Sequence, residues 1–293
     1  MLAVKERAYA KINLFLDVVG LRDDGFHDIR TVMQSISLFD EISVSKGQGK
    51  GGNVRIQLTG NRRLPSDNKN LAIAAARLFL AEAAINDDIE IKLNKTIPVA
   101  AGLAGGSADA AATLRALNKL YNKPFADKRL LSLAERLGSD VPFCLVGKTA
   151  LCEGRGERIT RLSSPCAFHV VVAVANERVS TPAAYSELDR MYSSFDGSVK
   201  RESEDAFSTL MSALSERQVP SVLYNIFEDA ILPSCDGAAN IKKLLLQLGA
   251  DAALMSGSGP SVFGIFPYKE KAICAKEALL SEGYTAYMAE TVI

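Results

Sequence analysis

The sequence has no tryptophan, only two histidines and no excess of charge of either sign. Two histidines, His27 and His169, are too few for a multi-histidine metal centre. Lys and Arg number 34 together, and so do Asp and Glu. A general binder of nucleic acid or of an anionic membrane needs a basic excess, which this chain lacks. We therefore expect no nucleic-acid partner and no membrane partner.

Long apolar runs are also missing. No stretch approaches the length of a membrane-spanning helix, and the N-terminus MLAVKERAYAK has no apolar signal core. The cysteines are few, odd in number and without a C-x-x-C pair: Cys144, Cys152, Cys166, Cys235 and Cys274. We interpret them as reduced, mostly buried thiols of a cytoplasmic protein.

The length of 293 residues allows one large or two medium domains. Alternating residues predict a strand over 8–19, and helical spacing predicts helices over 68–84, capped by Asn68 or Asn70, and over 107–121. A further helix is expected to end at Gly138, with that glycine as its C′ residue. The pattern resets near residue 163. This predicts two α+β domains, 1–163 and 164–293, that meet at a cleft.

The second half alternates between the two kinds of element. Helices are expected near 183–191, 204–214 and 238–248, and strands near 252–255, 261–266 and 285–289. The polar segment 193–205 is expected to form an exposed loop.

The stretch PVAAGLAGGSADAA, which starts at Pro98, puts bare backbone in front of an alanine-rich helix. Gly102, Gly105 and Gly106 let backbone N–H groups approach a ligand, and a helix N-terminus adds unpaired N–H groups and a positive dipole end. These features favour a phosphate site. The stretch has neither the Gly-Lys-Ser/Thr ending of a Walker A motif nor the G-x-G-x-x-G of a dinucleotide fold. The alternative is a structural turn before a closely packed helix.

Three polar residues elsewhere carry weaker signals. Lys11 and Asn13 share one side of the first strand, because side chains alternate along a strand. By themselves they favour a surface-facing strand edge. Asp140, in LGSDVPF, follows a helix end and by itself is typical of a turn or an N-cap.

Three further stretches have ordinary explanations when taken alone. Gly257 and Gly259, in LMSGSGPSVFGIF, are explained by a hairpin turn between two strands. Phe26 and Tyr185 are isolated aromatic residues, which are usually part of a core.

Taken together, the stretches AKINLFLDVVGLRDDGFHDI, PVAAGLAGGSADAA, LGSDVPF and SGSGPSVFG resemble the GHMP kinase superfamily, from Ala8 to about Phe266. The resemblance implies an α+β fold with a ribosomal-protein-S5-like N-terminal domain and a ferredoxin-like C-terminal domain. The A-K-I-N-L start and the G-F-H triplet are similar to the branch whose substrate is a cytidyl-diphosphate sugar alcohol. The mevalonate and homoserine branches differ at these positions.

The resemblance also implies a site, with ATP and Mg²⁺ as cofactors. The residues around the ATP phosphates would be Pro98, Val99, Ala100, Ala101, Gly102, Leu103, Ala104, Gly105, Gly106, Ser107 and Ala108. Lys11 and Asp140 would be the catalytic pair, with Asp140 accepting the proton of the attacking hydroxyl. The substrate or nucleotide contacts would be Asn13, Phe26, His27, Lys95, Thr181 and Tyr185, with His27 reading the cytosine edge between the rings of Phe26 and Tyr185.

The chain departs from the superfamily's usual pattern in places. Alanine stands at 100, 101 and 104, where many relatives have glycine, which puts in doubt a positive φ at every loop position. Phe26 stands where relatives often have tyrosine. Asp109, in the first turn of the helix, would repel phosphate if it pointed inward, so we expect it to face away.

Two alternatives stay open. One is another kinase of the superfamily, of the mevalonate or homoserine type, with a small hydroxy acid as substrate. The other is a non-catalytic nucleotide-binding protein on the same fold. We expect a monomer or a weak homodimer in either case.

Overall fold

The computed structural model describes residues 3–60, 65, 69–163, 165–192 and 201–293. Its contacts divide the chain into two compact units that are each assembled from separate segments. The first unit comprises Met1–Ala10, Phe39–Val99 and Ala104–Val146. The second comprises Lys11–Leu38, Ala100–Leu103 and Gly147–Ile293. The expected boundary near residue 163 falls inside the second unit, and the division into 1–163 and 164–293 stays a prediction.

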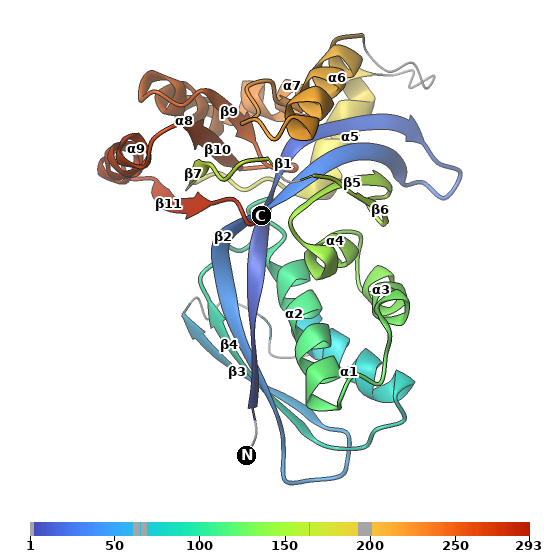
Figure 1. Ribbon diagram of the computed structural model, residues 1–293. Helices are drawn as coiled ribbons and strands as arrows, with labels where there is room; N and C mark the ends of the chain where they lie inside the picture. Colours follow the sequence, from blue (N-terminus) through green and yellow to red (C-terminus); the bar gives the residue numbers. More distant parts are fainter. Residues whose placement is uncertain (1–2, 61–64, 66–68, 164, 193–200) are drawn as a thin grey trace. The chain divides into compact units, whose positions relative to one another are not determined.

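Two long strands run through both units (Figure 1). They are β1, Ala3–Leu21, and β2, His27–Lys46. The turn between them has a local cause: Gly25 has a φ of 79°, and the Asp24 carboxylate accepts a hydrogen bond from the Phe26 N–H at 3.1 Å. The sheet order is β3-β4-β2-β1-β8, with β5 paired to β2 and β6 paired to β5.

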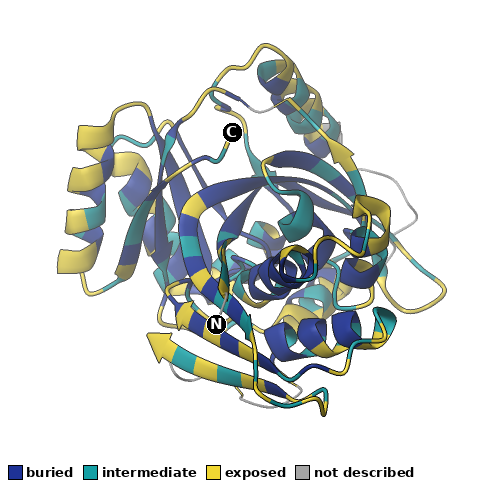
Figure 2. Cartoon of the chain, turned by 60° about the horizontal axis from the view of Figure 1, so that its bottom comes forward, coloured by how far each residue is buried: buried dark blue, intermediate teal, exposed yellow. Residues whose placement is uncertain are grey.

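The first unit adds two strands and four helices, in the part of the chain that is described. These are β3 Val54–Gly60, α1 Leu71–Glu82, β4 Ile89–Lys95, α2 Gly105–Leu120, α3 Asp127–Glu135 and α4 Val141–Val146. Buried and exposed residues alternate along β4, as its sequence IEIKLNK requires of a half-covered strand (Figure 2). The helices cover its apolar side.

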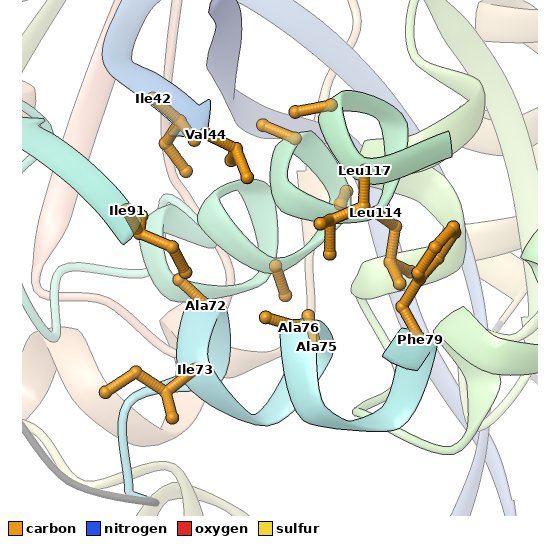
Figure 3. Packing of buried hydrophobic residues seen from close by; sticks show 14 of the residues in the cluster. Ile42, Val44, Ala72, Ile73, Ala75, Ala76, Phe79, Ile91, Leu114 and Leu117 are labelled. Atoms are coloured by element: carbon orange, nitrogen blue, oxygen red, sulfur yellow. The ribbon is translucent and has the colours of Figure 1, made fainter. Parts of the chain in front are cut away.

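One apolar core fills the space between strands and helices in this unit. Ile42, Val44 and Ile91 come from β2 and β4, and they meet the side chains of α1 and α2 (Figure 3). Both helices are rich in buried alanine, including Ala75 and Ala76 on α1. Small side chains let the two helix backbones approach closely, which explains the alanine-rich sequence after the glycine loop.

The helix ends show where the local signals were accurate. Asn70 caps α1 by accepting the Ala72 N–H at 3.0 Å, and Asn68 lies outside the described residues. Helix α2 begins at Gly105, two residues earlier than expected. Helix α3 ends at Glu135 with Arg136 as its C-cap, so the C′ residue is Leu137, and Gly138, which was predicted there, lies one residue further on. The short helix α4 was not predicted.

The second unit contains a four-stranded antiparallel sheet in the order β11-β7-β10-β9. Its strands are β7 His169–Val174, β9 Ala252–Met255, β10 Ser261–Phe266 and β11 Thr285–Glu290. The other strands of this unit are β5 Thr149–Gly154, β6 Arg158–Arg161 and β8 Tyr224–Asn225. Its helices are α5 Thr181–Met191, α6 Arg201–Ser215, α7 Phe227–Ile231, a 3₁₀ turn Leu232–Ser234, α8 Asp236–Gln247 and α9 Lys269–Ser281.

Several expectations for this half need correction. Residues 201–205 are the first turn of α6 and not loop, and 193–200 lie outside the described residues. Helices α7 and α9 were missed. Helix α9 buries Ala272, Ala275 and Leu279, and two alanines leave only a faint apolar stripe in the sequence.

The cysteines are less buried than expected. Cys152 and Cys235 are buried, but Cys166 and Cys274 are exposed, and no disulfide occurs within the described part of the chain. No helix among the described residues is long and apolar enough to cross a membrane.

Candidate active site

Lys11 and Asn13 lie on the same side of β1, as alternation predicts, but they are not at a surface-facing edge. Lys11 is 4% exposed and Asn13 is 1% exposed. The Lys11 ammonium donates to Asn13 Oδ1 at 2.7 Å, and Asn13 Nδ2 donates to Thr31 Oγ1 at 2.8 Å. The expectation of an exposed edge was wrong because both sides of this part of β1 are covered. A buried, hydrogen-bonded lysine is a costly arrangement to keep without a use for its charge.

Two glycine-containing segments of the second unit lie against Lys11. The Lys11 N–H donates to the Leu103 carbonyl at 3.2 Å, and Ser256 Oγ donates to the Gly102 carbonyl at 3.1 Å. A Cβ at Gly257 would lie 3.3 Å from Lys11 Nζ. The Ser256–Gly259 turn is the predicted hairpin between β9 and β10, and it also forms a wall beside the lysine.

Asn225 holds this turn in place, and the sequence offered no signal for it. Its Nδ2 donates to the carbonyls of Met255 at 2.7 Å and Gly257 at 2.8 Å. Asn225 belongs to the two-residue strand β8, which pairs in parallel with β1. A strand so short has no periodicity from which it could be predicted.

The predicted phosphate loop has a backbone suited to an anion. Ala100, Gly102 and Ala104 have φ values of 55°, 74° and 54°, so two of the unusual alanines adopt the left-handed conformation that glycine favours. Ala104 is the N-cap of α2, and no side-chain hydrogen bond caps this helix within the described residues. Its first-turn N–H groups therefore remain for a ligand.

Space is available at the start of α2. Gly106 is exposed, and a Cβ there would meet only Leu71 Cδ1, at 3.6 Å. Val99 is also exposed, and Pro98 and Ser107 are partly buried. Ala100 is exposed and Ala104 is partly buried, whereas Ala101, Leu103 and Ala108 are buried.

Lys95 is part of a buried charge cluster in the first unit. Its ammonium donates to Asp109 Oδ2 at 2.8 Å and to the Asp40 carboxylate. Asp40 Oδ1 also accepts the N–H groups of Thr96, at 2.5 Å, and Ile97, at 2.8 Å. Asp109 is thus turned onto Lys95. The role of Lys95 as a contact to substrate or nucleotide stays a prediction, and its ammonium already has two carboxylate partners.

The cluster shifts the protonation of Asp109. Burial raises the pKa of the Asp109 carboxyl to about 8, although the Lys95 charge opposes the rise. The neighbouring Asp40 carboxylate adds to it.

His27 lies against a carboxylate and an aromatic ring of the second unit. Its Nε2 is 2.7 Å from Asp189 Oδ1, and its ring stacks on Tyr185 with centroids 4.7 Å apart and planes at 24°. Phe227 packs edge-on against Tyr185, at 4.8 Å. Phe26, taken alone, was expected to be a core residue, and this expectation was wrong. It is 55% exposed, with the Arg155 guanidinium 5.1 Å from its ring centroid.

One face of α5 carries the other predicted substrate contacts. Thr181, Tyr185 and Asp189 recur every fourth residue, so they lie above one another. Thr181 Oγ1 is 2.9 Å from Ser258 Oγ, in the turn beside Lys11. Helix α5 therefore connects that turn with His27. The sequence did not point to Asp189, because its only signal is the spacing from Tyr185.

Asp140 belongs to the first unit and Lys11 to the second. Asp140 directly precedes α4, and its carbonyl accepts the Cys144 N–H at 3.0 Å, so it is the N-cap of that helix. Its side chain is partly buried. The catalytic pairing of these two residues stays a prediction.

Two family regions match this chain. The N-terminal domain of GHMP kinases matches residues 70–148, and the C-terminal domain matches residues 198–285. The chain belongs to the GHMP kinase family and has its two-domain fold.

Two relatives and one solved structure show the similarity over nearly the whole chain. A 4-diphosphocytidyl-2-C-methyl-D-erythritol kinase of Caldicellulosiruptor saccharolyticus is 40% identical over 273 residues, which cover 93% of this chain and 91% of that protein. The enzyme of the same name from Clostridium tetani is 37% identical, over 99% of this chain and 100% of its own length. A crystal structure of 4-(cytidine 5'-diphospho)-2C-methyl-D-erythritol kinase superposes with a TM-score of 0.80 at 31% identity, covering 98% of each chain.

Proposed function

We propose that this chain transfers the γ-phosphoryl group of ATP to the 2-hydroxyl of 4-diphosphocytidyl-2-C-methyl-D-erythritol. The relatives named above support the substrate, since their similarity extends over more than nine-tenths of the chain. The main structural support for a kinase is the N-terminus of α2. No side chain caps it in the described structure, residues with positive φ precede it, and there is open space at Gly106.

The start of α2 fits the phosphates of a nucleotide. Backbone N–H groups at a helix N-terminus bind anions through hydrogen bonds and the helix dipole. Mg²⁺ neutralises phosphate charge when bound, and it is typically held by phosphates, water and one or two carboxylates. No group of three or more His, Cys, Asp or Glu side chains that could hold a metal ion gathers among the described residues.

The acceptor alcohol needs a proton acceptor and a positive charge near the transferring group. Asp140 would accept the hydroxyl proton, and its position as a helix N-cap fixes its backbone. Lys11 would stabilise the negative charge of the transferring group. Asn13 holds the Lys11 ammonium through a 2.7 Å hydrogen bond, so the charge is already oriented before substrate binds.

The cytosine would be read beside α5. His27 has a ring nitrogen held by Asp189, and Tyr185 supplies an aromatic face next to it. Phe26, which directly precedes His27 in the chain, is exposed and offers a second ring. Aromatic faces bind any base by stacking, whereas polar contacts to the base edge discriminate between bases.

The test is a panel of alcohols incubated with the purified protein, ATP and Mg²⁺, with products identified by mass. The panel includes the cytidyl-diphosphate alcohol, its uridyl analogue, mevalonate and homoserine. Phosphorylation of the cytidyl compound alone is the expected result. Preferred use of mevalonate or homoserine would assign the chain to another branch of the family.

A non-catalytic nucleotide-binding role is the remaining alternative. It predicts ATP binding without ATP consumption for every alcohol of the panel. The burial of Lys11 and its hydrogen bond to Asn13 favour an enzyme, since nucleotide binding by α2 alone does not need them. That the chain acts as a monomer or a weak homodimer stays a prediction.

A further inference from the structure

A cluster of three buried charged residues joins the start of α2 to the sheet of the first unit. Lys95 ends β4, Asp40 belongs to β2 and Asp109 lies in α2. The Lys95 ammonium is 2.8 Å from Asp109 Oδ2. At Gly105, the first residue of α2, a Cβ would lie only 2.9 Å from Lys95 Nζ. The helix backbone therefore begins directly against this ammonium.

The charges of the cluster do not balance when all three residues are ionised. Two carboxylates and one ammonium leave one negative charge uncompensated, and all three residues are at most 4% exposed. A buried uncompensated charge is strongly unfavourable, so the cluster has a lower free energy when one carboxyl is protonated.

The proton belongs on Asp109. Both oxygens of Asp40 already accept hydrogen bonds: Oδ1 from the N–H groups of Thr96 and Ile97, and Oδ2 from the Lys95 ammonium. Asp109 Oδ1 is buried without a hydrogen-bond partner among the described residues. The pKa of Asp109, raised to about 8 mainly by burial, agrees with this assignment.

We propose that Lys95, Asp40 and Asp109 are positioning residues for the nucleotide phosphates, and that a proton held on Asp109 keeps the start of α2 receptive to them. The proposal rests on the proposed function, since it takes the α2 N-terminus as the phosphate site. Loss of this proton puts an uncompensated negative charge beneath the first turn of the helix. Such a charge opposes a second anion nearby, and it is poorly screened because it is buried.

Few other groups can counter that effect. In the described structure, Lys95 from β4 and Asp40 from β2 are the charged groups that act on the Asp109 carboxyl. Helix α1 packs against α2 with apolar side chains, as Figure 3 shows for Ala75 and Ala76.

The experiment measures affinity for a non-hydrolysable ATP analogue by calorimetry between about pH 7 and about pH 9.5, a range that spans the Asp109 transition and leaves ordinary carboxyls ionised. Wild-type affinity is expected to fall on the order of tenfold across this range, the size of a charge effect at a helix terminus. Asp109→Asn, which cannot ionise, is expected to show a flat profile. Asp109→Ala, which also loses the bond to Lys95, is expected to bind more weakly throughout.

Asp87→Asn is the matched control in the same unit. Asp87 is also a buried carboxylate bonded to lysines, but hydrogen bonds from Lys50, Lys46 and Tyr121 lower its pKa to about 2. Its replacement is expected to leave the wild-type pH profile of nucleotide binding unchanged.

Thermal unfolding gives a second readout, which needs no nucleotide. The folded chain keeps the Asp109 proton between about pH 4 and about pH 8, where the same carboxyl in the unfolded chain has lost it. This group therefore lowers the free energy of unfolding as the pH rises through that window. The melting temperature of the wild type minus that of Asp109→Asn is therefore expected to decrease between about pH 5 and about pH 8, near the two ends of this window.

The outcomes separate the two ideas. Equal pH dependence of nucleotide binding in the wild type and Asp109→Asn would overturn the positioning role. A folded wild type that binds no nucleotide at any pH would contradict the proposed function, and the positioning role with it. If Asp109→Asn does not fold, the infrared band of a protonated carboxyl in the wild type decides: its absence at neutral pH would overturn the proposal.

Discussion

Tyr185 stacks on His27 with ring centroids 4.7 Å apart, so the aromatic ring meets the imidazole directly. The hydroxyl-bearing ring is in turn held edge-on by Phe227. Asp189, one helical turn beyond Tyr185, places its Oδ1 2.7 Å from His27 Nε2, within hydrogen-bond distance. The orientation of the imidazole is thus restrained on two sides before any base binds.

His27→Ala is expected to weaken binding of the cytidyl substrate and to narrow its advantage over the uridyl analogue. Cytosine and uracil exchange a donor and an acceptor, and two mismatched buried contacts at about 1–3 kcal/mol each give on the order of a thousandfold discrimination. Competition assays with both analogues measure this. His169→Ala, the other histidine, serves as control, and Phe26→Ala is expected to weaken both analogues alike. Equal use of the two substrates by the wild type would remove base reading from His27.

Asp140→Asn is expected to lower turnover by roughly two to four decades, the usual contribution of a general base, with ATP affinity nearly unchanged. Asparagine still supports the helix start, because the hydrogen bond from the Cys144 N–H goes to the Asp140 backbone carbonyl, which the substitution keeps. Steady-state kinetics decide the matter. Asp127→Asn, at the exposed start of α3, is the matched control. Turnover close to that of the wild type would exclude Asp140 from the mechanism.

Lys11→Met is expected to reduce turnover more than ATP affinity, because its charge is used most in the transition state. The variant also leaves Asn13 Oδ1 without its 2.7 Å donor, so some loss of stability is expected. Lys5→Met changes an exposed lysine on the same strand and is expected to behave as the wild type. A loss confined to the Michaelis constants would make Lys11 a binding residue only.

Gly106→Val is expected to abolish nucleotide binding while the protein stays folded. The new side chain has room in the protein, where a Cβ meets only Leu71, and it occupies the space before the helix that the phosphates would need. Gly102→Val is the informative contrast. Its Cβ would lie 2.1 Å from the Ser256 carbonyl, so this variant is expected to disturb folding itself. Calorimetry of nucleotide binding and melting curves of both variants distinguish the two effects. Retained nucleotide binding by Gly106→Val would show that the loop is a structural turn and not a phosphate site.

Local sequence determined many elements of this protein. Strands β9 and β10 lie where the two apolar stretches around the SGSG turn predicted them, and Asn70 caps α1 as its side chain favours. The glycine loop ahead of α2 was recognisable because backbone conformation depends on the residues in the loop itself. Membership of the kinase family was also readable from the combination of short motifs.

Tertiary structure decided what those motifs touch. Lys11 is buried because both sides of β1 are covered, and alternation along one strand cannot reveal a second covering layer. Asp189 contacts His27, which is 162 residues away in the sequence, and Lys95 binds Asp40 and Asp109, which belong to two other elements. Packing between distant segments brings such partners together, and burial then shifts the pKa of Asp109. Neither effect leaves a local pattern in the sequence.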